Sequence, residues 1–293
     1  MAVPAIRTEN LTKFYGRSRG IIDICLSVEE GDFFGFIGPN GAGKSTTIRT
    51  LLGLIFPASG RAEIFGKDIV SEKTGVLKDI GYMPSEASFY NNMKACDMIS
   101  YAAKLRGLDC GDEARRLCER LELDTSRKIG ELSLGNRKKV GIVIALQHRP
   151  KLCVLDEPTS GLDPLMQQEF YSIIKERNRD GATVFLSSHV LNEVSRNCKH
   201  AAVIRDGRLL VSDTVEKLGH TGVKHVTVQG IDRTPDFAGV GNLVQENGSI
   251  RFLYGGAPDA LIKELAAYSF EDISVKDPDL DEVFMHYYEG EAK

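Results

Sequence analysis

Apolar runs of strand length alternate with segments of helical periodicity along much of the chain. Residues 32–38 read DFFGFIG and residues 152–155 read LCVL, two nearly continuous apolar runs that are typical of buried parallel strands. Residues 46–55, TTIRTLLGLI, follow the first run and carry a helical spacing of apolar residues. A strand, a loop and a helix in this order favour an α/β fold for this part of the chain.

The middle and the end of the chain show other patterns. Residues about 88–130 have helical spacing, most clearly in 97–108 and 114–123. After Leu218 the predicted elements are strands, an amphipathic helix and a closing helix with an acidic first turn, at 219–230, 249–256, 258–268, 271–278 and 279–289. The sequence therefore predicts a small C-terminal α+β domain at 219–293, and no group in it indicates catalytic chemistry.

Composition limits the classes of protein that fit. The chain has 293 residues and a net charge of −4 with acidic and basic residues interspersed, which argues against a nucleic-acid-binding surface. Its six cysteines form no C-x-x-C pair, so we expect reduced thiols in a reducing compartment. No stretch approaches the roughly 20 apolar residues of a membrane span, and the amino terminus lacks the layout of a signal peptide. We therefore expect a cytoplasmic chain that does not cross a membrane by itself.

Residues 38–45, GPNGAGKS, fit the phosphate-loop pattern G-x-x-x-x-G-K-[ST]. The glycines let the backbone curl so that successive N–H groups point at the β- and γ-phosphates, and the helix that begins at Lys44 adds the positive end of its dipole. We expect the Lys44 ammonium to reach phosphate oxygens and the Ser45 hydroxyl to bind Mg²⁺. The expected nucleotide-binding residues of this segment are Gly38, Pro39, Asn40, Gly41, Ala42, Gly43, Lys44, Ser45 and Thr46.

Two acidic residues, Asp156 and Glu157, follow the apolar run at 152–155. Ligands of open α/β sheets bind at the carboxyl ends of the strands, so both side chains are expected at the nucleotide. Asp156 is the expected partner of Mg²⁺, and Glu157 is the expected base or orienter for the attacking water. Acidic pairs after strands also cap turns, but a phosphate loop in the same chain needs a carboxylate for its metal. The two segments together predict binding and hydrolysis of a nucleoside triphosphate.

A third segment resembles a family signature. Residues 132–136 read LSLGN and are followed by RKKVGIVIALQHRP and then by the strand that carries Asp156. In this order and spacing the chain resembles the ATP-binding cassette (ABC) family, whose signature, usually LSGGQ, lies between the phosphate loop and the aspartate strand. The resemblance covers roughly residues 4–218. Two positions depart from the family pattern, because Leu134 replaces its first glycine and Asn136 replaces its glutamine.

The resemblance assigns roles to further residues. Tyr15 matches the aromatic residue that stacks on adenine, although simple packing in a turn is an equal alternative for this residue. Asp163 ends the segment SGLD at 160–163, which matches the loop after the catalytic glutamate. His189 in the segment SSHV matches the family's switch histidine, which donates to the γ-phosphate or orients the water. The catalytic set implied by the resemblance and the motifs is therefore Lys44, Glu157 and His189.

The glutamine loop of the family is matched by IGYMPSE at 80–86, but the glutamine itself is replaced. Ser85 stands after the proline and Glu86 comes next. A hydroxyl can bind Mg²⁺ or carry a water, and a carboxylate is a stronger oxygen ligand for a hard cation. The sequence therefore leaves Ser85 and Glu86 open as metal-site residues, with a slight preference for Glu86.

The resemblance also implies an architecture for the ATP-binding domain, which we place at 1–218. It implies a phosphate-loop NTPase core, an antiparallel β subdomain near the amino terminus and a helical subdomain at about 88–148. In the family, the helical subdomain and the glutamine loop form the groove for a coupling helix of the membrane subunit. The candidate contact residues are Phe89, Tyr90 and Met93, for which core packing is an equal alternative.

ABC ATPase domains meet head to tail, so the resemblance implies a homodimer or a heterodimer of ATPase chains. Ser133 and the backbone N–H of Gly135 would then reach the γ-phosphate of the ATP held by the other chain. The implied cofactors are ATP and Mg²⁺, and the implied partner is an integral-membrane permease that holds the chain at the inner face of the cell membrane. No nucleic-acid partner is expected.

The C-terminal segment resembles the tails of ABC ATPases that serve separate exporter-type permeases, including those linked to peptide-antibiotic resistance. We therefore expect export of a drug, peptide or lipid-like substrate. The alternative is a soluble ABC ATPase acting in translation or DNA repair. The chain has one cassette and no basic patch, and the gap between its phosphate loop and its signature is too short for a coiled-coil insertion, so the alternative is disfavoured.

Overall fold

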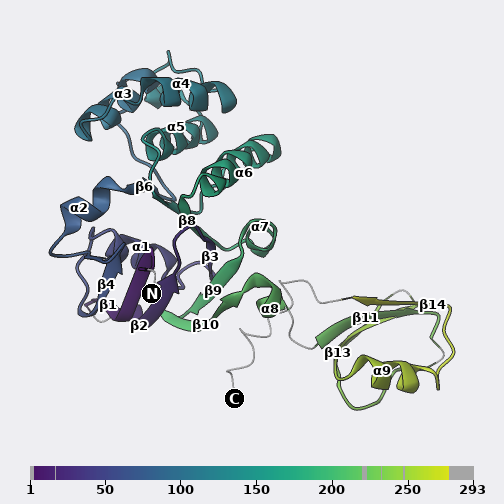
Figure 1. Ribbon diagram of the computed structural model, residues 1–293. Coiled ribbons are helices and arrows are strands. Elements are labelled where there is room, and N and C mark those ends of the chain that lie inside the picture. Colours follow the sequence, from purple (N-terminus) through teal and green to yellow (C-terminus); the bar gives the residue numbers. More distant parts are fainter. Residues whose placement is uncertain (1–2, 17, 220–222, 232, 247, 277–293) are drawn as a thin grey trace. The chain divides into compact units, whose positions relative to one another are not determined.

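The computed structural model describes residues 3–16, 18–219, 223–231, 233–246 and 248–276 (Figure 1). The chain divides into two compact units, Met1–Asp213 and Thr214–Lys293. The sequence pattern changes slightly later, after Leu218, because the second unit begins with a short helix, α8 (Val215–Gly219). Within the described residues, none of the helices has both the length and the apolar character that a membrane span needs.

The core of the first unit is a sheet of six strands in the order β10-β9-β3-β8-β7-β6. These strands are β3 (Phe33–Ile37), β6 (Ile80–Met83), β7 (Leu152–Asp156), β8 (Thr183–Ser188), β9 (His200–Arg205) and β10 (Arg208–Thr214). From β6 to β9 the neighbours pair in parallel. Every residue of β3, β7 and β8 is buried, as expected for central parallel strands. The carboxyl ends of these three strands therefore lie at one edge of the sheet.

A second sheet packs its apolar face into the same core. Its strands, in the order β2-β1-β4-β5, are β1 (Ile6–Tyr15), β2 (Ser18–Val28), β4 (Ser59–Ile64) and β5 (Lys67–Asp68). β1 pairs antiparallel with both β2 and β4. Its Ile6 joins Phe36 and Phe185 of the central sheet in one cluster of buried side chains, in which the last two rings have centroids 5.3 Å apart. This is the antiparallel β region that the resemblance implied.

Helices surround the central sheet, and Figure 1 shows α3, α4 and α5 grouped at the end of the unit opposite β1, β2 and β4. The helices of this unit are α1 (Lys44–Leu51), α2 (Lys73–Lys78), α3 (Ala95–Leu105), α4 (Gly111–Arg120), the 3₁₀ turn η1 (Ile129–Glu131), α5 (Leu134–Leu146), α6 (Pro164–Arg179) and α7 (Leu191–Asn197). α5 packs against α3, α4 and β6. Phe89 and Met93 are half-buried and Tyr90 is exposed, so the predicted permease contact stays a prediction.

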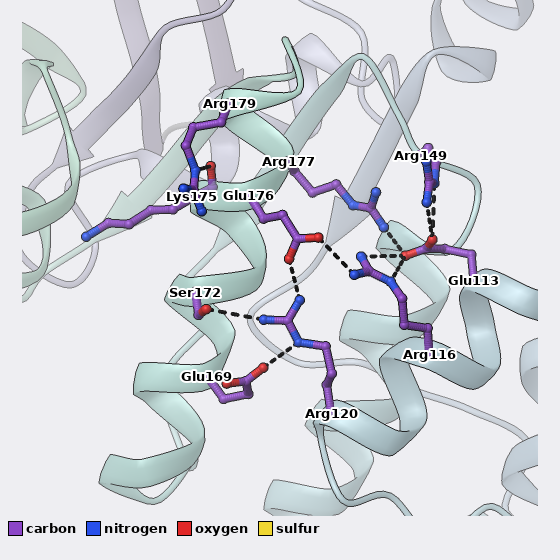
Figure 2. Close-up of polar contacts among 10 residues, drawn as sticks. All are labelled: Glu113, Arg116, Arg120, Arg149, Glu169, Ser172, Lys175, Glu176, Arg177 and Arg179. Atoms are coloured by element: carbon purple, nitrogen blue, oxygen red, sulfur yellow. Dashed lines mark hydrogen bonds and ion pairs between the residues drawn. The ribbon is translucent and has the colours of Figure 1, made fainter.

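Arginines of α4 bind glutamates of α6 in a network that we call the α4–α6 ion-pair cluster (Figure 2). Arg116 Nη1 lies 2.8 Å from Glu176 Oε1, and Arg120 Nε lies 2.5 Å from Glu169 Oε1. Arg120 also donates to the second oxygen of Glu176. Hydrogen bonds from Arg116 and Arg120 lower the pKa of Glu176 to about 2. The cluster therefore links the group of α3, α4 and α5 to α6.

Glu113 extends this cluster by forming ion pairs with three arginines (Figure 2). It accepts from Arg116, which lies on the same helix, from Arg149 after α5, and from the buried Arg177 of α6. Burial alone would raise the pKa of Glu113, but the hydrogen bond from Arg149 and the charges of Arg177 and Arg116 outweigh it and hold the pKa below its ordinary value. Residues distant in the sequence are thus joined at one carboxylate.

The second unit contains an antiparallel sheet in the order β12-β13-β11-β14 and one helix besides α8 within its described residues. These elements are β11 (Val223–Gln229), β12 (Val240–Glu246), β13 (Ser249–Gly255), α9 (Pro258–Leu265) and β14 (Asp272–Lys276). Phe252, Tyr254 and Leu261 belong to its buried cluster. The sequence reading missed β12, whose side chains are largely exposed. The predicted closing helix at 279–289 lies outside the described residues.

Candidate functional site

A cavity of about 270 Å³ lies at the loop between β3 and α1. Gly41 and Gly43 of this loop have φ angles of +80° and +111°, a region that favours glycine. A Cβ on Gly43 would lie 3.0 Å from Cγ2 of Ile21, so the close approach also requires glycine. Of the predicted loop residues, Gly38 and Ala42 are buried beside the cavity. The cavity is lined by Gly20, Pro39, Asn40, Gly41, Gly43, Lys44, Ser45, Thr46, Ser85 and Glu157.

Lys44 is the buried cation of this cavity. Its Nζ donates to the carbonyl oxygens of Gly38, at 2.6 Å, and Pro39, at 3.2 Å. The same atom lies 3.1 Å from Oε1 of Glu157. The ammonium therefore makes two hydrogen bonds to backbone oxygens and one ion pair with a carboxylate. It lines the cavity, where it is placed to attract phosphate oxygens.

Asp156 is buried at the end of β7, with 1% of its surface exposed. Its Oδ1 accepts a hydrogen bond of 2.5 Å from the hydroxyl of Ser187, which is its register partner on β8. Its Oδ2 is buried and has no hydrogen-bond partner among the described residues. A buried carboxylate oxygen without a donor is costly unless a cation binds it, so this atom fits a hard divalent metal.

Glu157 is fixed through both its backbone and its carboxylate. It has a φ of +50°, which is uncommon for a residue with a side chain. Its N–H donates to the backbone oxygen and to the hydroxyl of Ser187, each at 3.2 Å. Its Oε2 accepts from Nδ1 of His189 at 2.6 Å, while Lys44 holds Oε1. The predicted catalytic residues Lys44, Glu157 and His189 are therefore brought together.

Sequence reasoning missed two residues of this site. Ser187 was read only as part of the histidine segment, and the pairing of β7 with β8 is what places it on Asp156 and Glu157. Lys138 of α5 was not singled out at all. Its Nζ donates to the carbonyl oxygens of Ser85 and Glu157, both at 2.9 Å. Lys138 stands in a run of three basic residues, Arg137 to Lys139, before the apolar part of α5, so no local pattern distinguished it from its neighbours.

The structure separates the two candidates of the glutamine loop. Ser85 lines the cavity, whereas Glu86 is exposed and is not among the lining residues. Tyr15, at the end of β1, is 45% exposed, and one edge of its ring would lie 3.3 Å from a Cβ on the cavity residue Gly20. The ring is thus close to the cavity, and Nζ of Lys13 lies over it, 5.9 Å from its centroid.

The signature residues lie at the start of α5 and do not line the cavity. The Ser133 hydroxyl caps the helix by accepting from the N–H of Asn136 at 3.3 Å. A Cβ on Gly135 would lie 3.0 Å from the carbonyl oxygen of Gly161, so the signature abuts the loop at 160–163. Asp163 of that loop caps α6 by accepting from the N–H of Met166. Leu134, in the place of a glycine, is 70% exposed.

Comparison with known proteins gives a consistent result. Residues 21–160 match the family model described as ABC transporter. The chain is 38% identical over 234 residues to a bacitracin transport ATP-binding protein of Bacillus licheniformis, covering 78% of this chain and 76% of the relative. It is 34% identical to a linearmycin resistance ATP-binding protein of Bacillus subtilis, with the same coverage.

Solved structures agree with these matches. The structure of an ATP-binding subunit of an ABC transporter superposes with a TM-score of 0.68 at 29% identity, covering 73% of this chain and 91% of that one. A dimeric bacterial ABC transporter cassette, MJ0796, gives a TM-score of 0.66 at 25% identity, covering 72% and 98%. The predicted α/β fold with a phosphate-loop NTPase core is thereby confirmed.

Proposed function

The chain belongs to the ATP-binding subunits of ABC transporters, and we propose that Glu157, held between Lys44 and His189, activates the water that cleaves ATP in it. The family membership makes the chain an ATPase that forms dimers and acts with a separate membrane permease. The observation that carries the assignment of Glu157 is its carboxylate geometry, 3.1 Å from Lys44 and 2.6 Å from His189 at the edge of the phosphate-loop cavity.

Each residue has a separate task in this proposal. Lys44 and the N–H groups of the loop at 38–46 bind the phosphates, and Tyr15 stacks on the adenine. Glu157 accepts a proton from the attacking water or orients it, and His189 holds the carboxylate and reaches the γ-phosphate. Ser187 orients Asp156 and Glu157 together.

Ser45, Asp156 and Ser85 are the residues that would hold Mg²⁺. Ser45 and Ser85 line the cavity, and Asp156 has the unpartnered buried oxygen at the end of the neighbouring strand. When bound, the cation would neutralise charge on the phosphate oxygens. The exposure of Glu86 argues for Ser85 as the replacement of the family's glutamine.

The signature of one chain is proposed to complete the ATP site of the other. Ser133 and Gly135 lie outside the chain's own cavity, at the amino terminus of α5, where N–H groups and the helix dipole favour an anion. Asp163 follows the adjoining loop and would lie at the same interface. ATP then acts as the ligand that favours the closed dimer, and hydrolysis releases it.

The proposed cargo is a peptide or lipid-like antibiotic, and the proposed direction is export. This rests on the relatives, one of which is named for bacitracin transport and another for linearmycin resistance. Through its permease the chain would lie at the inner face of the cell membrane. The alternative of an ABC ATPase acting in translation or DNA repair has no support from these relatives.

The test of this proposal is the ATPase rate of the full chain copurified with its permease. Glu157→Gln should retain ATP binding and lower turnover by roughly 10²- to 10⁴-fold, the usual contribution of a general base. Lys44→Ala should instead abolish tight ATP binding. A Glu157→Gln variant with the turnover of the unmodified chain would remove Glu157 from this role.

A further inference from the structure

Lys138 is a buried ammonium that joins two segments of the site. It is 5% exposed and lies on α5, the helix that begins with the signature. One N–H of its ammonium donates to the carbonyl oxygen of Ser85, and another donates to that of Glu157. Ser85 lies on the loop after β6 and Glu157 on the loop after β7. A single side chain therefore holds three segments together.

The backbone of Glu157 needs such support. A φ of +50° places this residue in a region that side chains rarely occupy, and such conformations persist only where the surroundings hold them. The N–H of Glu157 is held by Ser187 of β8, and its carbonyl oxygen is held by Lys138. Among the described residues, Lys138 is the side chain from α5 that bonds to Glu157. Without Lys138, the carbonyl oxygen of Glu157 would lose this hydrogen bond.

Nearby carboxylates offset part of the cost of burying the charge of Lys138. Burial lowers its pKa below the ordinary value, while Glu157, Asp156 and Glu86 act in the opposite direction. Hydrogen bonds from a charged donor are shorter and stronger than neutral ones. Removing the ammonium would leave the partly buried carbonyl oxygens of Ser85 and Glu157 without this donor.

We propose that Lys138 is a positioning residue that sets the orientation of the Glu157 carboxylate and couples it to the position of the signature helix. This inference rests on the proposed function, in which Glu157 serves the ATP of its own chain and the start of α5 serves the ATP of the partner. A shift of α5 when the dimer closes would then reach the water-activating carboxylate through Lys138. Each chain would hydrolyse its ATP only when the start of its α5 contacts the ATP of the partner chain.

The first test is the steady-state ATPase of the full chain with Lys138→Met, which has a similar shape and no donor. We expect kcat to fall roughly 10- to 100-fold, because small misplacements of a reacting group have costs of this size. The KM for ATP should stay within about twofold, since Lys138 does not line the cavity. Lys139→Met is the matched control, because Lys139 is the next residue of the same helix and is also buried.

Lys138→Gln separates positioning from a general effect on folding. Its amide carries two N–H donors without charge, on a side chain that is one bond shorter than that of lysine. We expect it to recover part of the kcat that Lys138→Met loses, while the thermal midpoints of both variants stay close together. A Lys138→Met variant with unchanged kcat would overturn the inference. The inference would also be overturned if Lys138→Met lowered kcat, ATP affinity and the thermal midpoint together and Lys138→Gln restored none of them.

A double-mutant cycle with Glu157→Gln identifies the residue through which Lys138 acts. If Lys138 works by orienting the carboxylate, Lys138→Met should cost little further single-turnover rate in the Glu157→Gln background. Full additivity of the two losses would contradict the inference and leave the role of Glu157 intact. Normal turnover in Glu157→Gln alone would instead contradict the proposed function, so the two failures are distinguishable.

Discussion

The Ser187 hydroxyl lies 2.5 Å from Oδ1 of Asp156 and donates to it. The same oxygen of Ser187 accepts from the N–H of Glu157 at 3.2 Å, so one hydroxyl orients both acidic residues. This arrangement depends on the parallel register of β7 and β8, which sets Asp156 opposite Ser187. Ser187 thus links the proposed metal-binding carboxylate to the proposed water-activating one.

Replacing Ser187 by alanine should lower the Mg²⁺-dependent ATPase rate by roughly 10- to 100-fold, as is usual for partners that orient metal ligands. The concentration of Mg²⁺ giving half-maximal rate should rise, because Asp156 loses its donor. Ser188→Ala is the control, since the Ser188 hydroxyl donates to Glu193 instead. Equal effects of the two substitutions on the ATPase rate would show that the hydrogen bonds of Ser187 do not contribute specifically to the metal site.

The glutamine-loop position can be decided by two single substitutions. We predict that Ser85→Ala lowers the Mg²⁺-dependent ATPase rate, whereas Glu86→Ala leaves it nearly normal, because only Ser85 lines the cavity. The loss in Ser85→Ala should be about tenfold or more if the hydroxyl or its water binds the metal. Adenine affinity, measured with ADP in the absence of metal, should change little in both variants. A larger loss in Glu86→Ala would reverse the assignment.

Leu134 should weaken the ATP-dependent dimer. Its exposed side chain stands at the start of α5, and its Cδ2 would lie 3.3 Å from a Cβ on Gly161. In the proposed dimer, a bulky group there would crowd the surface that faces the nucleotide of the partner chain. Sedimentation of the Glu157→Gln chain with ATP should show a weak dimer. In the double variant with Leu134→Gly, the equilibrium between monomer and dimer should shift toward the dimer. Leu134→Ala is the control for backbone flexibility and should have an intermediate effect.

The α4–α6 ion-pair cluster should stabilise the fold above acidic pH. The pKa of Glu176 is about 2 in the folded chain against an ordinary 4.5, so its charged form is favoured by folding. Its contribution is therefore fully present above about pH 4.5 and is lost as the pH falls toward 2. Glu176→Gln should lower the free energy of unfolding by about 1 kcal/mol at pH 7, given the partial exposure of the cluster.

Urea denaturation at several pH values measures this effect. The difference between the unmodified chain and Glu176→Gln should shrink as the pH falls below 4.5. Glu119→Gln is the control, because Glu119 is an exposed glutamate of α4 outside the cluster. A difference that is independent of pH would show that the loss comes from packing rather than from charge.

The parts of the site that were predictable are those carried by continuous segments of sequence. The loop at 38–46, Asp156 and Glu157 each follow directly after an apolar strand, so their meeting at one edge of a parallel sheet could be expected. Their spacing to the signature was equally visible in the sequence. The overall α/β architecture followed from the same pattern.

The parts that were not predictable depend on pairing between distant segments. Ser187 reaches Asp156 through the register of two strands, and Lys138 reaches Glu157 through the packing of a helix on the sheet. Glu113 meets Arg149 and Arg177 because two helices and a loop converge, which no local pattern indicates. β12 was missed because its apolar residues Val240, Leu243 and Val244 do not alternate regularly with polar ones.

Helix α6 connects the loop beside the signature to helix α4. It starts at its cap Asp163, beside the signature, and its later turns are tied to α4 by Glu169 and Glu176. The ion pairs and the helix cap thus form a continuous path of contacts from α4 through α6 to the loop at 160–163. Because these ion pairs are only partly buried, dissolved salt should screen them, and the strength of the link between α4 and α6 is expected to fall as ionic strength rises.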